Sequence, residues 1–245
     1  MGDKQCEHYD KHCKIYTSCC SKYFNCRLCH DKISEDCPPL DRFKLDRIMC
    51  KKCDTEQPIS NTCIKCNIKF GSYFCKICNL FDNNTDKQQF HCPKCGICRV
   101  GGMDNFYHCG KCGICISIKI KDTHKCINNS FHSNCPICFD PLFDSTKPLQ
   151  LMKCGHTIHS ECFTELLSNN TLSSIRCPIC NKTTIDATNF FNYLENEINS
   201  TPLPDELKYD VRILCNDCNL ASITKFHIIG HKCIKCGSFN TVKND

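Results

Sequence analysis

Cysteine is the feature of this sequence that most limits how the chain can fold. Thirty of the 245 residues are cysteine, and nearly all of them lie in Cys-x2-Cys pairs or beside a histidine. Two thiolates three residues apart can bind one metal ion, and mixed cysteine and histidine sites suit tetrahedral zinc. The spacing therefore predicts a row of structural zinc sites.

Apolar residues supply little additional core. The chain has no tryptophan, and cysteine makes up about three-tenths of the 41% of residues that count as hydrophobic. A structural zinc site in a finger peptide contributes roughly 10–16 kcal/mol of apparent binding energy, more than a small apolar core leaves after the entropy cost of folding. We expect a small zinc-stabilised multidomain protein, irregular, with short β-hairpins and few helices.

The start of the chain and its charge bear on location and partners. The residues after Met1 are polar and do not form a secretion signal, and no run approaches the ~20 apolar residues of a membrane span. We expect a cytoplasmic and/or nuclear protein that is not secreted and has no membrane partner, with cysteines that bind metal instead of forming disulfides. The formal net charge of +5 counts cysteine as neutral. Zinc-bound thiolates would make the net charge negative, which disfavours nucleic acid as a partner.

Residues 1–68 contain irregularly spaced ligands. The last four ligands of this segment predict one site, because a short loop lets two Cys-x2-Cys pairs bind the same ion. These ligands are Cys50, Cys53, Cys63 and Cys66. The earlier ligands must form two interleaved sites, and the sequence leaves open which of them share an ion: Cys6, His8, Cys19, Cys20, Cys26, Cys29, His30 and Cys37.

Residues 69–128 contain an internal repeat. His91-Cys92-x2-Cys95-x2-Cys98 recurs as His108-Cys109-x2-Cys112-x2-Cys115. We predict three ions in a spiral, with these ligand sets: Cys75, Cys78, Cys92 and Cys95; His91, Cys98, Cys109 and Cys112; His108, Cys115, His124 and Cys126. An iron–sulfur cluster is the alternative, but Gly102 stands where a ferredoxin has a further cysteine, and histidine precedes each run. We therefore favour zinc.

Residues 133–182 contain the most informative spacing. From Cys135 to Cys180 the order is C-x2-C-x15-C-x-H-x2-H-x2-C-x14-C-x2-C, the eight-ligand spacing of a RING-H2 domain. A RING is cross-braced, so the two predicted sets are Cys135, Cys138, His159 and Cys162, and Cys154, His156, Cys177 and Cys180. All eight ligands are protein side chains, so neither ion keeps the open position of a catalytic zinc.

Resemblance to other RING domains implies a docking groove for a ubiquitin-conjugating enzyme. Its residues would be Ile137 on the first zinc loop, Leu166 on a short helix expected over 159–169, and Pro178 on the second loop. Leu166 stands where many RINGs have tryptophan. Asn181 stands where many have an arginine that bridges the conjugating enzyme and ubiquitin, and asparagine lacks the guanidinium fork.

Residues 183–245 predict a helix followed by one more zinc site. Asp186 or Thr188 can cap a helix in which apolar residues recur at helical spacing. We favour packing of this helix on a zinc module over binding of a partner. Two knuckles at the ends of strand-like runs then predict a C-terminal zinc ribbon with the ligands Cys215, Cys218, Cys233 and Cys236.

These segments, in this order, resemble the family of RING and CHY zinc-finger domain-containing E3 ubiquitin-protein ligases over almost the whole chain. Phrases such as Cys6-Glu-His8-Tyr9-Asp10 and Cys26-Arg-Leu-Cys29-His30-Asp31 carry the resemblance. It implies a CHY zinc finger at 1–68, a CTCHY zinc finger (zinc spiral) at 69–128, a RING-H2 domain at 133–182, and a helix plus zinc ribbon at 183–245.

The same resemblance implies nine structural zinc ions, which would use all the ligands named above. Cys37 replaces a histidine of the family pattern, and Cys13 is left over. We interpret Cys13 as a spare thiol and not as a nucleophile, because no second catalytic domain surrounds it.

The implied activity is that of a RING-type E3 ubiquitin ligase with no covalent nucleophile. The RING would bind a ubiquitin-loaded conjugating enzyme, and the other modules would position a protein substrate for lysine ubiquitination. Two alternatives stay open: a non-catalytic zinc scaffold with a degenerate RING, which Asn181 favours, and a nucleic-acid-binding zinc protein. The sequence does not identify the substrate, the chain linkage, the conjugating enzyme or the oligomeric state.

Overall fold

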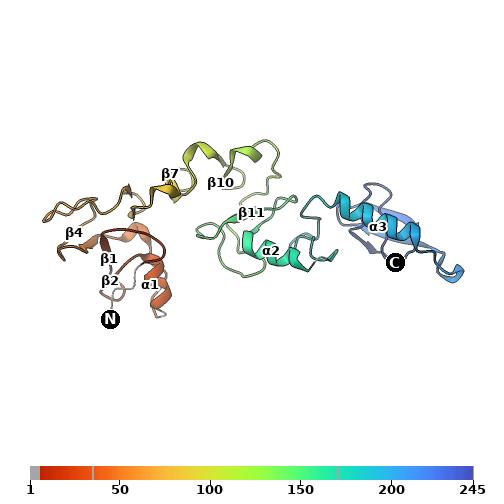
Figure 1. Cartoon of the computed structure of the whole chain (residues 1–245), viewed down its shortest axis with the longest axis horizontal. Coiled ribbons are helices and arrows are strands. Elements are labelled where there is room, and N and C mark those ends of the chain that lie inside the picture. Colours follow the sequence, from red (N-terminus) through yellow and green to blue (C-terminus); the bar gives the residue numbers. More distant parts are fainter. Residues whose placement is uncertain (1–5, 35, 170, 245) are drawn as a thin grey trace. The chain divides into compact units, whose positions relative to one another are not determined.

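The computed structural model describes residues 6–34, 36–169 and 171–244. Short strands and loops dominate these residues, and the helices are α1 (Arg27–Ile33), α2 (Ser160–Ser168) and α3 (Thr188–Ser200) (Figure 1). The expected fold class, with short hairpins and few helices, is confirmed. No helix of the described residues is both long and apolar enough to cross a membrane.

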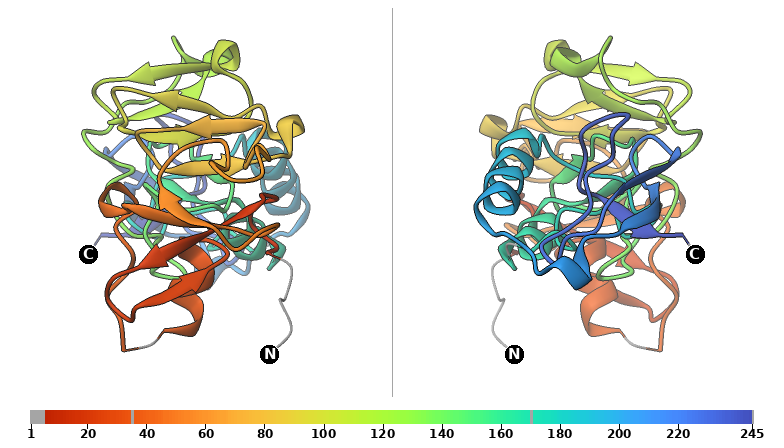
Figure 2. Two further views of the ribbon diagram at one scale, coloured as in Figure 1. Left: turned by 90° about the vertical axis from the view of Figure 1, so that its left-hand side faces the viewer. Right: turned by 90° about the vertical axis from the view of Figure 1, so that its right-hand side faces the viewer.

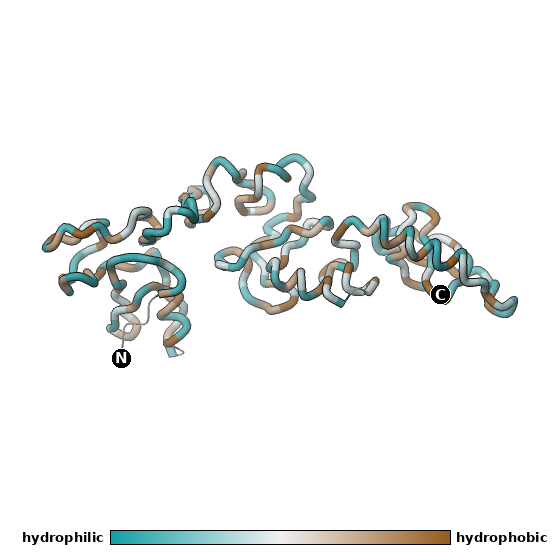
Figure 3. The backbone as a smooth tube through the Cα atoms, in the orientation of Figure 1, coloured by the Kyte–Doolittle hydropathy of each residue, from teal (hydrophilic) through white to brown (hydrophobic). Residues whose placement is uncertain are grey.

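The chain divides into two compact units. The first takes the chain up to His108 together with Cys115–Lys119, and the second takes Cys109–Ile114 together with the chain from Ile120 onwards. Figure 3 shows that apolar residues are spread through both units in short runs. Neither unit has the long apolar segments that build a large core, which agrees with a fold held by metal.

An antiparallel sheet in the order β2-β1-β3-β4 begins the first unit. Its strands are β1 (Cys13–Thr17), β2 (Lys22–Phe24), β3 (Arg47–Cys50) and β4 (Glu56–Pro58). Burial alternates along β1, so one of its faces lies in the core. The core also contains Phe81, which stacks on Phe74 at a ring distance of 4.7 Å and meets Phe70 edge-on at 6.3 Å. Such aromatic pairs stabilise a small core beyond the area that they bury.

Three short hairpins follow this sheet (yellow to green in Figure 2). They pair β5 (Tyr73–Cys75) with β6 (Leu80–Asp82), β7 (Phe90–Cys92) with β8 (Ile97–Arg99), and β9 (Phe106–Cys109) with β10 (Ile114–Ser117). A Cys-x2-Cys pair connects the strands of each hairpin. Isolated two-stranded hairpins are marginally stable in water, so these need the metal that their cysteines can bind.

The second unit contains a hairpin of β11 (Leu149–Leu151) and β12 (Thr157–His159), and α2 begins directly after β12. Leu142, Met152 and Ile158 are buried between the cysteines of this segment. The helix expected over 159–169 is confirmed as α2, and Phe163 packs from it against the same core.

A three-stranded sheet in the order β14-β13-β15 completes the second unit, with β13 (Asp210–Cys215), β14 (Ala221–Lys225) and β15 (Thr241–Lys243). Helix α3 has Ala187 at its N-cap position, so neither Asp186 nor Thr188 is the N-cap residue that the sequence suggested. The Asp186 carboxylate, one residue earlier, accepts hydrogen bonds from the Thr188 amide at 3.1 Å and hydroxyl at 2.6 Å. Phe191 of α3 lies 6.0 Å from the buried Phe239, ring to ring. The interpretation of α3 as a helix that packs on a zinc module is confirmed.

Candidate zinc centres and the RING surface

The ligands of residues 6–68 come together in groups of four whose ligand atoms all lie within 4.8 Å of one another. The groups are Cys6, His8, Cys26 and Cys29; Cys19, Cys20, His30 and Cys37; Cys50, Cys53, Cys63 and Cys66. The structure thus separates the two interleaved sites that the spacing left open. It also places Cys37, the departure from the family pattern, beside three other ligands.

Distances within these groups fit a tetrahedral zinc ion. With a Zn–S bond of about 2.3 Å, two sulfur ligands of a tetrahedron lie about 3.8 Å apart. The Sγ atoms of Cys50 and Cys66 are 3.7 Å apart, and those of Cys53 and Cys63 are 3.5 Å apart. A disulfide would need about 2.05 Å, so these pairs are spaced to hold a metal and not to bond to each other.

The spiral of residues 69–128 is grouped differently from our prediction. The structure brings together Cys75, Cys78, His91 and Cys98, and then Cys92, Cys95, His108 and Cys115. The remaining ligands form the third set: Cys109, Cys112, His124 and Cys126. In this set the Sγ of Cys126 lies 3.7 Å from the Sγ of Cys109 and 2.9 Å from His124 Nε2. The predicted spiral, which paired neighbouring Cys-x2-Cys knuckles, is wrong.

Strand alternation explains this correction. In the β7–β8 hairpin, His91 lies directly opposite Cys98, so both side chains project from the same face. Cys92 is the next residue on the strand and projects from the other face. His91 therefore meets Cys78 of the preceding hairpin at 3.4 Å, whereas Cys95 meets His108 of the following hairpin at 3.2 Å.

The RING ligands have the cross-braced arrangement that their order predicts. Cys138 Sγ lies 3.2 Å from His159 Nδ1, and burial beside Cys138 and Cys135 raises the pKa of Cys162 to about 12. In the other set, His156 Nδ1 lies 3.6 Å from both Cys154 and Cys177. Several thiolates packed this closely repel one another without a cation, and a zinc ion would bind these cysteines as thiolates.

The ribbon brings its two knuckles together in the same way. Cys215 Sγ lies 3.6 Å from Cys236, and Cys218 Sγ lies 3.7 Å from Cys233. His227, between the knuckles in sequence, contacts the Thr201 carbonyl at 3.0 Å and accepts from the Ile229 amide. It is therefore a packing and hydrogen-bonding residue, as predicted.

Sequence reasoning missed the residues that orient the histidine ligands. His30 Nε2 lies 3.1 Å from Cys19 Sγ, and its Nδ1 lies 2.8 Å from Asp31 Oδ1. His159 Nε2 lies 3.0 Å from the Ser145 hydroxyl. Such outer partners hold the ring orientation and the tautomer that a zinc ligand needs. Asp31, directly after a ligand, is the one that the sequence could have indicated.

In nine of the Cys-x2-Cys pairs, the residue after the second cysteine adopts a left-handed backbone conformation. These residues are Asp54, Asn67, Asn79, Gly96, Gly113, Phe139, Asn181, Asn219 and Gly237. In most of these knuckles the amide of that residue donates to the carbonyl of the first cysteine, as in Asn181 to Cys177 at 2.8 Å. Glycine, asparagine and aspartate tolerate positive φ, and Phe139 is the exception among them.

The predicted docking residues are accessible on the RING. Ile137 and Leu166 are half-buried, and Pro178 and Asn181 are exposed. Phe139, which the prediction omitted, follows the first RING knuckle with 72% of its surface exposed. An exposed apolar side chain on a backbone with positive φ does not stabilise the folded state. We therefore count Phe139 with the accessible apolar residues of the RING.

Comparison with known proteins identifies the modules. Residues 6–73 match the CHY zinc finger family, residues 134–182 match the zinc-RING finger domain, and residues 185–242 match a zinc-ribbon family.

Whole-chain relatives extend this match. The chain is 43% identical to E3 ubiquitin-protein ligase SRFP1 of Oryza sativa subsp. japonica, over 97% of this chain and 90% of that protein. It is 40% identical to E3 ubiquitin-protein ligase RZFP34 of Arabidopsis thaliana, over 96% of this chain and 83% of that protein. It also matches zinc finger protein BRUTUS of Arabidopsis thaliana at 40% identity, over 96% of this chain and 19% of that longer protein. With the RING cross-brace and the CHY ligand groups in place, this chain belongs to the RING and CHY zinc-finger E3 ubiquitin-protein ligases and is a RING-type ubiquitin transferase.

Proposed function

We propose that the RING binds a ubiquitin-loaded conjugating enzyme while the other zinc modules hold a protein substrate, so that a substrate lysine reaches the loaded ubiquitin. The observation that carries this proposal is the position of the accessible apolar residues. Ile137 and Pro178 lie on the two zinc loops, and Leu166 lies on α2 between them in sequence. A shallow apolar surface on a metal-braced frame suits a transient protein partner.

Transfer would go directly from the thioester of the conjugating enzyme to the lysine. Cys13, the one cysteine outside the ligand sets, is 0% exposed in the core of the first unit, and burial raises the pKa of its thiol. A buried neutral thiol cannot attack a thioester. The contribution of this chain is therefore positioning, which converts a bimolecular reaction into one between groups already in place.

We further propose nine zinc ions, all structural, with three each in the CHY finger and the spiral, two in the RING and one in the ribbon. Each ion would be bound by four side chains, which leaves no coordination position for a substrate. The division at 1–68, 69–128, 133–182 and 183–245 follows these ligand sets.

The test is release of ubiquitin from a loaded conjugating enzyme to free lysine, measured with the zinc-loaded full chain against a panel of conjugating enzymes. Ile137→Ala is expected to lower the rate about tenfold or more, because a central apolar contact of an interface contributes that much to binding. Zinc content should stay unchanged.

Ile77→Ala is the matched control. Ile77 occupies the same position within its Cys-x2-Cys knuckle as Ile137, is 60% exposed, and lies in the first unit. It should discharge ubiquitin at the wild-type rate. Equal rates for Ile137→Ala and wild type would overturn the assigned docking surface.

A further inference from the structure

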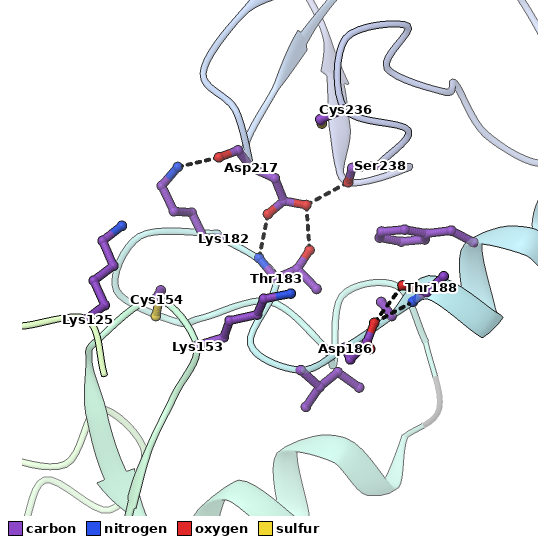
Figure 4. A pocket seen from close by; sticks show the side chains of 13 residues that line it. Lys125, Lys153, Cys154, Lys182, Thr183, Asp186, Thr188, Asp217, Cys236 and Ser238 are labelled. Carbon is purple, nitrogen blue, oxygen red and sulfur yellow. Dashed lines mark hydrogen bonds between the residues drawn. The ribbon is translucent and has the colours of Figure 1, made fainter. Parts of the chain in front are cut away.

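The second zinc loop of the RING is joined to the ribbon by a polar contact inside the second unit. The loop runs from Cys177 to Lys182 and is closed internally by the Cys177 amide, which donates to the Lys182 carbonyl at 2.8 Å. The residues that follow the last ligand of the loop meet the first ribbon knuckle (Figure 4). A pocket of about 330 Å³ lies beside this contact, lined by Lys153 and Asp186 among others.

Asp217 is the centre of the contact. Its Oδ1 accepts from the Thr183 amide at 2.7 Å, and its Oδ2 accepts from the Thr183 hydroxyl at 2.7 Å and the Ser238 hydroxyl at 2.6 Å. Hydrogen bonds to a charged carboxylate are about twice as strong as neutral ones, so this is a strong attachment point.

Lys182 and Asn240 attach the loop on either side. Lys182 Nζ donates to the carbonyls of Asn216 at 3.2 Å and Asp217 at 2.6 Å. Asn240, which is 0% exposed, donates from Nδ2 to the Asn181 carbonyl at 2.7 Å. The ribbon therefore binds three consecutive residues, Asn181, Lys182 and Thr183, which directly follow the last zinc ligand of the RING.

We propose that Asp217 and Asn240 are positioning residues for the RING, which hold its second zinc loop in the conformation that the conjugating enzyme binds. Asn181 has a φ of 57°, its carbonyl is tied to Asn240, and its side chain is exposed. The ribbon thus sets the direction in which Asn181 faces a partner, and the same loop carries Pro178. A loop ordered before binding does not lose that freedom when the partner arrives, which raises affinity without new contacts. This inference rests on the proposed function.

Thr183→Val tests the proposal with little disturbance of the RING. The substitution keeps the size of the side chain and removes the hydroxyl, whose described partners, Asp217 and Asn240, both belong to the ribbon. Thr183→Ser restores the hydroxyl. Thr241→Val is the matched control, because it removes a threonine hydroxyl bonded at 2.8 Å to the His231 carbonyl within the ribbon.

The measurement is discharge of a loaded conjugating enzyme to free lysine by the full chain, with kcat and the KM for the conjugating enzyme separated. Thr183→Val should raise KM about tenfold or more, the change expected when a buried hydrogen bond to a charged group is lost, with kcat and zinc content unchanged. Thr183→Ser and Thr241→Val should keep the wild-type KM.

An unchanged KM for Thr183→Val would overturn the inference, whether or not the variant melts earlier. If Thr183→Val fails to bind zinc, Lys182→Met decides instead, since it removes the bonds to the Asn216 and Asp217 carbonyls. It should raise KM in the same direction, and a wild-type KM would overturn the inference. A wild-type chain that discharges no conjugating enzyme would sink the proposed function and this inference with it. If the wild-type chain is active and the variants keep the wild-type KM, only this inference is contradicted and the proposed function stands.

Discussion

The zinc spiral allows a crossed test of which ligands share an ion. Cys78→Ser with Cys98→Ser removes two ligands that the structure places in the same group, whereas Cys78→Ser with Cys95→Ser removes one ligand from each of two groups. The first pair should cost one zinc ion per chain and the second pair two. Grouping by neighbouring knuckles in the sequence predicts the reverse.

Loss of a zinc ion should strongly destabilise the hairpins of the spiral, because they have few other stabilising contacts. β5, β6, β7 and β8 are three residues long, and such isolated hairpins are marginally stable. A structural zinc site contributes roughly 10–16 kcal/mol of apparent binding energy, so its loss should unfold the hairpins locally and not merely weaken them.

Native mass spectrometry after dialysis against a chelator gives the ion count directly, and amide exchange in β5–β8 reports the local unfolding. Cys13→Ser, outside every ligand group, is the control and should keep all its zinc. Loss of two ions in the Cys78 and Cys98 variant together with loss of one in the Cys78 and Cys95 variant would refute the grouping.

Two further substitutions test residues outside the ligand sets. Cys13→Ala should leave the zinc count unchanged and lower the free energy of unfolding by about 1 kcal/mol, because it removes one sulfur atom from a fully buried site; loss of an ion in mass spectrometry would contradict this. Asn181→Arg should speed lysine discharge by adding a guanidinium to the docking surface. It should also lower the free energy of unfolding by about 1 kcal/mol, because arginine is less stable than asparagine at a φ of 57°. A discharge rate at or below wild type would show that this position does not face the loaded conjugating enzyme.

The RING and the ribbon could be predicted well because their ligand spacing leaves little choice. In the RING, the unequal gaps between Cys135 and Cys180 match one known cross-brace, and the structure brings the same sets together. In the ribbon, four cysteines in two knuckles can form only one site. The ligand sets of the spiral could not be predicted in this way, because the repeat allows several ways of dividing its twelve ligands among three ions.

The contact between the RING and the ribbon had no sequence signal. Asp217 lies between two ribbon ligands, where its carboxylate could equally face solvent, and Asn240 lies in a segment with no motif. Their roles depend on Thr183 and Asn181, which are between 34 and 59 positions away along the chain. Hydrogen bonds over such separations are set by how two modules pack and not by local pattern.

By itself, the sequence determined the metal, the order of the modules and the family, because a thiolate or imidazole at the right spacing has few uses besides binding zinc. Only the tertiary structure decided which ligands of the spiral share an ion, since strand alternation sends His91 and Cys92 to opposite faces of one hairpin. It also decided that the ribbon holds the RING loop, because a hydrogen bond depends on distances between atoms that spacing along the chain does not contain.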